Sequence, residues 1–595
     1  MIRILLAVLY LFMSGLGYAA SDERTSLAGS SHAVVNLLSF GARPNDPTFN
    51  SRLPFQQALD TLRRSGGGIL SIPAGDYYLA FPDIASDVDP DDTRNAALLK
   101  EKNLKREKLI LAPPGTMVQG AVDKAGNPST RIHWRATSFP LLSFVNSDGS
   151  GIRDIAFVFD GVQPQFFPWP QENFLEQVGY KGRWLGGPYE LSTVIYTIGS
   201  SGLRFENISF HSSKMPADNG HTFAFGIVSK GKGPVPQPEA NSVNTLSWGT
   251  KIPGGGLSDC VSSNVFRSLR FEDYVMGILA SGQCSAVFEN IEGNYRGSWY
   301  RSFDPLHETG PDIKHIGPPG HLIYLTFQNA YDVQGYQDAP AGRAVFHSTT
   351  RNRDVTLRNV KEGPETLSNL NSLGTLALKD IEHGLVANVV SQHPAGLIQS
   401  MIDAHDVQLD NLSWSSDRDI CAELGSRSNC GVPVIALEPG PADSDSQFNS
   451  RVQFRNITLQ SSRRPAIFKI SEESGHLPLS RDISVDGLRI ECDPGFESKQ
   501  ESPRGIITLR TVATHLRDIR YTPLIPSDAI SHRQNYAALI QSGSSDTTID
   551  ITIKRSQSYT GDDALAYQSI IEGQHGPTPS PETDNKCRIL RKLVN

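Results

Sequence analysis

One short phrase recurs along the chain and constrains its fold more than any other feature. An apolar–x–apolar pair is followed by Asn, Asp or Gly and then by further apolar alternation. Each copy is typical of a short β-strand next to a turn, because strand side chains alternate with period two and Asn, Asp and Gly favour turns. The copies lie at 152–157, 203–210, 287–291, 355–360, 376–381, 407–412, 452–457, 483–488 and 516–519.

The spacing of the copies predicts a parallel β-helix. The turn positions 359 and 380 are 21 residues apart, and 380 and 411 are 31 apart. Irregular coils that share one fixed turn are typical of this architecture. We therefore expect the asparagines of the phrase to occupy turns or strand ends on related coils, where stacked side chains can hydrogen-bond. These asparagines are Asn207, Asn290, Asn359, Asn411 and Asn456.

Residues 55–79 predict a cap at the N-terminal end of the solenoid. Helical spacing separates Phe55, Ala58, Leu59 and Leu62, and the glycines at 66–68 then end the helix. Strands are expected at 69–72 and 77–79, on either side of a Pro-Ala-Gly turn. A helix in this place would cover the exposed core at one end of the stack, as a solenoid requires.

The same N-terminal region resembles the pectate-lyase-like, right-handed parallel β-helix superfamily, and more narrowly its rhamnogalacturonase-like and glycoside-hydrolase-28-related branch. The resemblance rests on Phe40-Gly41-Ala42, the helix beginning at Phe55 and the segment 66–77. It implies an all-β fold, a single-stranded right-handed parallel β-helix with an N-terminal capping helix. The family's Gly-Asp-Gly and Asp-Asp-Thr motifs are replaced here by the sequence of 43–50, so the resemblance concerns the fold rather than the chemistry.

Residues 1–19 have the pattern of a secretory signal peptide. Arg3 precedes an apolar run at 4–13, and Gly17 and Ala19 stand where small residues precede a cleavage site. The run is too short for a membrane span, which needs about 20 apolar residues. We expect a secreted or periplasmic protein with a β-helix domain at 34–570, inserts near 83–108, 163–192 and 294–350, and a loose tail at 573–595.

The charge and the cysteine content limit which binding partners and which cellular compartment the sequence predicts. The chain has 55 basic and 63 acidic residues without a basic stripe, which argues against a nucleic-acid partner. Its six cysteines suit an oxidising compartment, and their spacing contains no CxxC zinc motif. We predict a disulfide between Cys421 and Cys430, and Cys260 could also meet Cys284 one coil later. The sequence leaves the oligomeric state open.

Titratable side chains are concentrated in the middle of the chain. Seven of the 15 histidines lie between 307 and 405, and the segment 294–353 is rich in polar and aromatic residues. Loops carry function more often than regular coils do, so we place the site there. The catalytic candidates are His321, His347, Tyr324, Arg343, Asp304 and His307, and the substrate-binding candidates are Arg301, Trp169, Trp184, Trp299 and Arg351.

These residue types suit β-elimination on an acidic, uronate-containing polysaccharide. The reaction needs a base at the C5 proton, a cation at the carboxylate and an acid at the leaving oxygen. His347 or His321 would be the base, Tyr324 would be the acid, and Arg343 would neutralise the carboxylate. Trp169 or Trp184 would stack on sugar rings along the groove wall.

Three other functions stay open. A glycoside hydrolase would use paired carboxylates, with Asp304, Glu308, Asp312 and Asp332 as candidates. The segment 303–308 is similar to the Asp-Pro-His motif of alginate C5-epimerases, with Leu306 inserted. A non-catalytic glycan-binding β-helix is the third. No cofactor is firmly indicated, and calcium stays open because many lyases of the family bridge uronate with it, although the acidic run in 83–92 lacks the pattern of a calcium loop.

Overall fold

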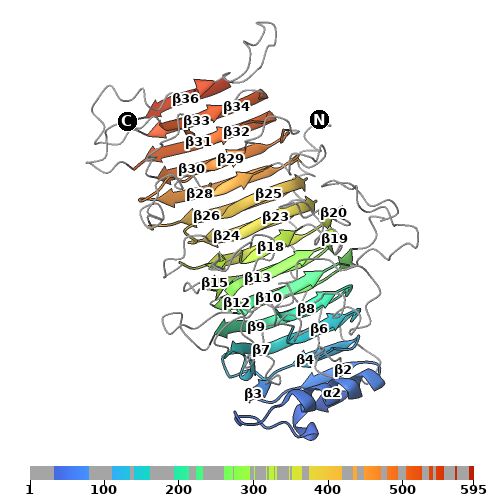
Figure 1. The fold of residues 1–595 in the computed structure, drawn as a ribbon. Coiled ribbons are helices and arrows are strands. Elements are labelled where there is room, and N and C mark those ends of the chain that lie inside the picture. The colour runs from blue at the N-terminus through green and yellow to red at the C-terminus, as the bar shows by residue number, and fades with distance from the viewer. Residues whose placement is uncertain are drawn as a thin grey trace, which may run out of the picture. The chain divides into compact units, whose positions relative to one another are not determined.

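The repeated phrases form successive coils of a parallel β-helix (Figure 1). The computed structural model describes residues 33–79, 110–134, 140–160, 193–212, 223–231, 260–272, 274–294, 300–301, 316–317, 321–326, 329–330, 347–348, 351–364, 374–418, 433–438, 448–470, 479–492, 504–524, 535–540, 544–554, 570–571 and 588–594. Residues 34–595 form one unit, and everything below concerns that unit. The signal-peptide prediction and the inserts at 83–108 and 163–192 lie outside the described residues.

Two long sheets carry the coils, and every ladder within them is parallel. Sheet 1 has 17 strands. They are β1 (Val34–Asn36), β2 (Gly68–Ser71), β3 (Gly75–Leu79), β4 (Thr116–Gln119), β5 (Thr130–Trp134), β7 (Gly151–Phe159), β9 (Arg204–Ser212), β12 (Val265–Glu272), β15 (Val287–Asn294), β22 (Thr356–Glu362), β24 (Leu385–Ser391), β26 (Gln408–Ser415), β28 (Gln453–Ser461), β30 (Ser484–Cys492), β32 (Val512–Pro523), β34 (Ser545–Lys554) and β36 (Arg588–Val594).

Sheet 2 has 15 strands. They are β6 (Leu142–Val145), β8 (Thr193–Ile198), β10 (Phe223–Lys230), β13 (Tyr274–Ser281), β18 (Ile323–Thr326), β23 (Leu376–Glu382), β25 (Ile398–His405), β27 (Ile435–Leu437), β29 (Phe468–Ile470), β31 (Arg504–Leu509), β33 (Asn535–Ile540) and β35 (Ile570–Ile571), with the short β11 (Val261–Ser262), β14 (Gln283–Cys284) and β21 (Asn352–Arg353). Parallel crossover connections are right-handed in nearly all proteins. The predicted fold class, a right-handed parallel β-helix, is confirmed.

The predicted asparagine turns are also confirmed. Asn207, Asn290, Asn359, Asn411 and Asn456 all have φ between 51° and 56°, in the left-handed region that bends the chain. Each bend lies inside a strand of sheet 1 rather than at its end. The amides form a ladder: Asn359 donates to Asn290 at 3.0 Å, Asn388 donates to Asn359 at 3.0 Å, and Asn411 donates to Asn388 at 2.8 Å. Asn tolerates this backbone better than other residues with a side chain, which explains its recurrence.

Sheet 1 fixes the order of its coils from both faces. On the inner face the rings of Phe205, Phe266 and Phe288 stack, with centroids 5.5 and 4.6 Å apart. On the outer face Glu289 lies between its register partners Arg267 and Arg358, with N–O distances of 2.9 and 2.7 Å. A slip by one coil would place like charges opposite each other, which is destabilising.

The N-terminal cap forms as predicted. The helix α2 (Arg52–Arg64) follows the 3₁₀ turn η1 (Leu37–Phe40) and packs against β1 and β2 at the blue end of the solenoid (Figure 1). It buries Phe55, Ala58, Leu59 and Leu62, each of which is 0% exposed. Among the described residues, no helix has the length and apolar character needed to cross a membrane.

The structure changes the prediction for the C-terminal tail and decides one of the two cysteine pairings. Part of the tail predicted at 573–595 is ordered, because Arg588–Val594 forms β36 and pairs in parallel with β34. Its register places positions 589 and 593 opposite Ile549 and Ile553. Cys421 and Cys430 lie outside the described residues, so that disulfide stays a prediction. The other pairing that the sequence allows, Cys260–Cys284, is confirmed as a disulfide with a Cα–Cα distance of 5.7 Å.

Candidate functional site

The outer face of sheet 2 carries the predicted Tyr324 on the short strand β18. Because strand side chains alternate, Ile323 and Leu325 point into the core and are 0% exposed, while Tyr324 points outward. Its register neighbours on the same row, Leu279 and Ala377, are apolar and buried. Tyr324 is half-buried. It is therefore a partly accessible polar group in an apolar row.

Two polar side chains influence the Tyr324 phenol. The ammonium nitrogen of Lys379 on β23 is 5.1 Å from the centroid of its ring, and hydrogen bonding to Thr326 of β18 and to Lys379 favours the phenolate. Burial alone would raise the pKa of Tyr324. The positive charge of Lys379, these two hydrogen bonds and the more distant charge of Lys230 outweigh burial, so the pKa of the phenol is lowered from its ordinary value of about 10. The phenolate is thus stabilised at this position.

His321 lies beside Tyr324 but differs from the expected base. It is 4% exposed, its Nδ1 is 2.8 Å from the carbonyl oxygen of Gly374, and its ring meets the Tyr324 ring edge-on at 5.2 Å. A carbonyl only accepts, so Nδ1 carries the proton. Burial, together with the charge of Lys379, lowers the pKa of His321 to about 3 despite that hydrogen bond. A neutral imidazole of such low basicity suits packing against Tyr324 better than proton abstraction.

A carboxylate pair lies next to Lys379 along the chain. Asp380 and Asp403 occupy equivalent positions on β23 and β25, where both have left-handed φ angles of 57° and 54°. Their side chains are only 1% and 5% exposed. Arg351 joins them, with N–O distances of 3.6 Å to Asp380 and 3.0 Å to Asp403. The guanidinium offsets the repulsion between two carboxylates stacked on neighbouring coils.

His405 extends this cluster to the next coil. Its Nε2 is 2.8 Å from Oδ1 of Asp403 and its Nδ1 is 2.6 Å from Oγ of Ser450. The arrangement has the residue types of a Ser-His-Asp triad. Ser450 is only 1% exposed, however, so a substrate cannot reach its hydroxyl. We interpret Asp403, His405 and Ser450 as a polar cluster that stabilises the turn between β25 and β26 (Gln408–Ser415).

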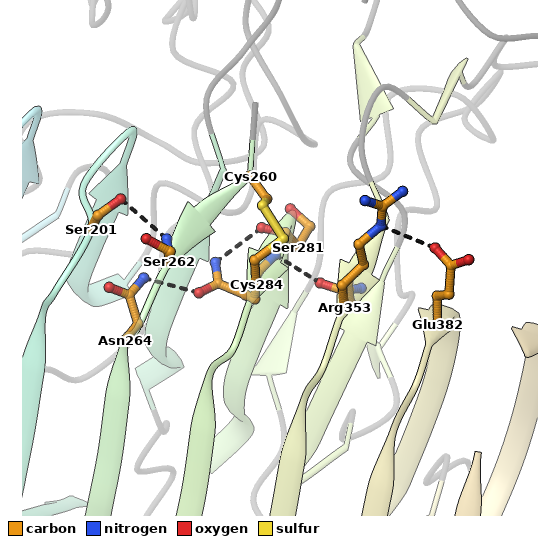
Figure 2. Close-up of a disulfide and its surroundings, with 10 residues drawn as sticks. Ser201, Cys260, Ser262, Asn264, Ser281, Cys284, Arg353 and Glu382 are labelled. Atoms are coloured by element: carbon orange, nitrogen blue, oxygen red, sulfur yellow. Dashed lines mark hydrogen bonds and ion pairs between the residues drawn. A yellow bond between two sulfur atoms is a disulfide. The ribbon is translucent and has the colours of Figure 1, made fainter. Parts of the chain in front are cut away.

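The disulfide lies at a neighbouring corner of the coils (Figure 2). Cys284 is on β14, which pairs with β11 on one side and with Arg353 of β21 on the other. Arg353 in turn forms an ion pair of 3.0 Å with Glu382 at the end of β23. The crosslink, the short strands and this ion pair together fix the C-terminal end of β23, the strand that contains Lys379 and Asp380.

The structure brings together part of the predicted site. His321 and Tyr324 are in contact, and Arg351 lies in the adjacent carboxylate cluster. The backbone of Arg301 is in β16 (Tyr300–Arg301), antiparallel to β17 (Ile316–Gly317), and that of His347 is in β20 (His347–Ser348), antiparallel to β19 (Asn329–Ala330). Asp304, His307, Arg343, Trp169, Trp184 and Trp299 lie outside the described residues, as do Glu308, Asp312 and Asp332.

The sequence patterns do not single out Lys379, Asp380 and Asp403. A signal exists at 376–381, where Lys-Asp interrupts an apolar strand, but this pattern by itself predicts only a turn of the coil. Among the described residues no group of three or more His, Cys, Asp or Glu side chains could hold a metal ion. Asp380 and Asp403 do not fit a calcium site, because Arg351 and His405 engage their oxygens and calcium takes six to eight oxygen ligands.

No family model matches the chain and no curated protein sequence matches it. The chain's own strand pairings define the fold as a parallel β-helix.

Three solved structures show a likeness to this fold. The A-module of the mannuronan C-5 epimerase AlgE6 from Azotobacter vinelandii is 11% identical, with 94% of this chain and 99% of that chain covered and a TM-score of 0.41. An exopolygalacturonase from Thermotoga maritima is 12% identical, with coverage of 82% and 87% and a TM-score of 0.30. A tailspike of E. coli bacteriophage HK620, in complex with a pentasaccharide, is 11% identical, with coverage of 94% and 78% and a TM-score of 0.41. At these identities the likeness concerns the fold alone.

Proposed function

We propose that the protein cleaves an acidic, uronate-containing polysaccharide by β-elimination at Tyr324. The observation that carries the proposal is the half-buried Tyr324 with the Lys379 ammonium nitrogen 5.1 Å from its ring centroid, where that charge lowers the pKa of the phenol. A phenolate at this site can accept the C5 proton. The C4–O bond then breaks as the C4=C5 double bond forms, and the departing oxygen takes a proton from the same phenol or from water.

Lys379 would serve the substrate as well as Tyr324. An ammonium group has three donors, so one can hold the phenol while the others bind the uronate carboxylate. Neutralising that carboxylate stabilises the charge that develops when the C5 proton leaves. Arg343 remains proposed for the same role, and Arg301, Arg351, Trp169, Trp184 and Trp299 remain proposed contacts along the polymer. His307, Asp304 and His347 remain proposed as further proton carriers.

The proposed localisation of the protein is outside the cytoplasm, either secreted or periplasmic. The Cys260–Cys284 disulfide supports this proposal, because structural disulfides persist in oxidising compartments. A long polymer would meet the solenoid there. Nothing in the composition suits nucleic acid as a partner instead.

The test is incubation with a panel of polyuronates, read both as ultraviolet absorbance of unsaturated products and as new reducing ends. We expect both signals from the intact protein. Tyr324→Phe should lose the absorbance signal by roughly 10²-fold or more, as expected for a lost acid–base group. Tyr196→Phe is the matched control, because Tyr196 lies on the same outward row three strands away, on β8, and is 0% exposed.

A glycoside hydrolase is the second candidate, and one observation favours it. Asp380 and Asp403 lie on neighbouring strands, which are about 4.8 Å apart, and retaining glycosidases separate their carboxyl groups by about 5–5.5 Å. Their burial weighs against it, because a sugar must reach both groups. Reducing ends without unsaturated product, lost in Asp403→Asn but kept in Tyr324→Phe, would favour the hydrolase.

A further inference from the structure

We infer that Asn352 is a positioning residue for Tyr324. It holds in place the backbone at Thr326 and at Lys379, the two residues whose side chains lie beside the phenol. The inference rests on the proposed function only for its consequence in catalysis. Its structural part concerns contacts of described residues. Asn352 touches neither the phenol nor the outer face, so it acts through Thr326 and Lys379.

Asn352 is fully buried and uses both ends of its amide. It is 0% exposed, on the core side of β21. Its Nδ2 donates to the carbonyl oxygen of Thr326 at 3.1 Å and to that of Lys379 at 3.2 Å. Its Oδ1 accepts from the backbone N–H of Gln283 at 3.1 Å. A buried carbonyl without a partner is costly, so this amide fixes the positions of three chain segments at once.

The two carbonyls belong to the two residues that hold Tyr324. Thr326 and Lys379 point outward from the paired strands β18 and β23, on the same side as Tyr324, and the Lys379 ammonium nitrogen is 5.1 Å from the Tyr324 ring centroid. Their carbonyls lie beneath this face, where one amide group ties them together. A shift of either segment would change the distance of its side chain from the phenol, and the attraction between the Lys379 charge and the phenolate weakens as that distance grows.

The support for Asn352 comes from the disulfide corner. Gln283, whose N–H binds Asn352, precedes Cys284 and uses its own side-chain amide to donate to the carbonyl oxygens of Ser229 and Ser281. Asn352 is therefore anchored to coils on the N-terminal side of the site. Arg351, one residue earlier, holds the Asp380–Asp403 pair on the other side.

Asn449 is a matched residue elsewhere in the solenoid. It is also 0% exposed, its Nδ2 donates to the carbonyl oxygens of Met401 and Glu438 at 3.1 and 3.0 Å, and its Oδ1 accepts from Ala404 at 3.1 Å. It makes the same kind of corner but does not contact the segments that hold Tyr324. Loss of Asn449 thus measures the structural effect of a corner amide alone.

The experiment compares Asn352→Leu with Asn449→Leu in the full chain. The Tyr324 ionisation is isolated as the difference in tyrosinate absorbance between each protein and the same protein carrying Tyr324→Phe. This titration needs no substrate, so it tests Asn352 even if the chain proves not to cleave polyuronate. Turnover on the polyuronate panel is the second measurement.

We expect both leucine variants to lower the melting temperature, and only Asn352→Leu to move the Tyr324 titration to higher pH. With substrate, Asn352→Leu should lower kcat roughly tenfold while KM stays within about twofold. Equal titrations in wild type and Asn352→Leu would overturn the inference, as would an equal shift in both variants. If Asn352→Leu does not fold, Asn352→Ser is compared with Asn449→Ser, and an unshifted titration there would be equally decisive against it.

Discussion

The ammonium nitrogen of Lys379 lies 5.1 Å from the centre of the Tyr324 ring, on a strand adjacent to that of the tyrosine. These residues are 55 positions apart in the sequence, and the parallel register of β18 and β23 places them side by side. The charge of Lys379 is the main influence that opposes the effect of burial on the phenol. The lowered pKa of Tyr324 therefore depends on the pairing of two coils.

Removing that charge should inactivate the site without unfolding it. In Lys379→Met we expect the pKa of Tyr324 to rise, because burial remains and its main counterweight is gone. Turnover on polyuronate should fall by roughly 10²-fold, the scale of one lost electrostatic contact. Lys469→Met is the control, since Lys469 is also a half-buried lysine of sheet 2, on β29. Equal activity of the two variants would remove Lys379 from the mechanism.

His133 should make stability depend on pH at the N-terminal end. Its ring stacks on Tyr78 at 4.6 Å, and its nitrogens are each 2.8 Å from a carboxylate, Asp160 at Nδ1 and Asp76 at Nε2. Arg131 also binds Asp76 and, as the largest cause, lowers the pKa of that carboxyl to about 2. Burial acts to lower the pKa of His133, but the two carboxylates outweigh it and the pKa is raised.

A raised pKa means that protonation of His133 stabilises the folded state. The contribution is fully present below the unfolded value of about 6.5 and is lost as the pH rises through the folded pKa. Asp76 adds stability above its unfolded value that disappears as the pH falls toward 2. His133→Phe should lower the free energy of unfolding by about 2 kcal/mol at pH about 5.5, and by less at alkaline pH. If the loss of unfolding free energy in His133→Phe were the same across this pH range, the ion pairing of His133 with Asp76 and Asp160 would be contradicted.

In the asparagine ladder, the loss of stability on substitution should depend on the backbone conformation as well as on the hydrogen bonds of the side chain. Asn388 has φ of 55°, donates to Asn359 and accepts from Asn411. Asn388→Gly should lower the free energy of unfolding by about 1 kcal/mol, since only the side-chain bonds are lost. Asn388→Ala should cost about 1–2 kcal/mol more, because its Cβ disfavours the left-handed conformation. The chain already uses Gly487, with φ of 77°, at the equivalent position of β30. Denaturant unfolding that ranks alanine at or above glycine would contradict this account.

The disulfide should stabilise one whole coil. Cys260 and Cys284 are separated by 24 residues, a loop that contains β12 and β13. Cys260→Ser with Cys284→Ser should lower the free energy of unfolding by roughly 3 kcal/mol. Reducing agent should lower the melting temperature of the wild-type protein toward that of the double variant and leave the double variant unchanged. A wild-type melting temperature insensitive to reduction, with the crosslink shown to be open, would speak against this role.

The sequence predicted the solenoid well because coil formation depends on local patterns. Asn359 and its equivalents mark bends that each require a left-handed residue, and Phe55 to Leu62 mark a helix with one apolar face. The site depends on register between distant coils. Arg351 reaches Asp403 52 residues further along, and the intervening coil lengths are irregular, so no fixed spacing reveals the pair. The same applies to Tyr324 and Lys379.

His321 shows that the basicity of a histidine cannot be predicted from sequence alone. Histidine is a plausible base in a sequence, but its basicity depends on burial and on the groups around it. Here the carbonyl oxygen of Gly374 fixes the proton on Nδ1, and burial makes the charged form unfavourable. Neither contact can be inferred from the residues adjacent to His321 in the sequence.

The most direct test of the central claim is a paired titration of Tyr324 and of activity. Tyrosinate absorbance of the wild-type protein minus that of Tyr324→Phe should show one phenol that ionises below the ordinary range near pH 10. The rate of unsaturated product formation from polyuronate should rise with pH along the same curve, because the phenolate is the base. An ordinary or higher ionisation of Tyr324, or a rate that rises at a different pH and survives in Tyr324→Phe, would contradict the account.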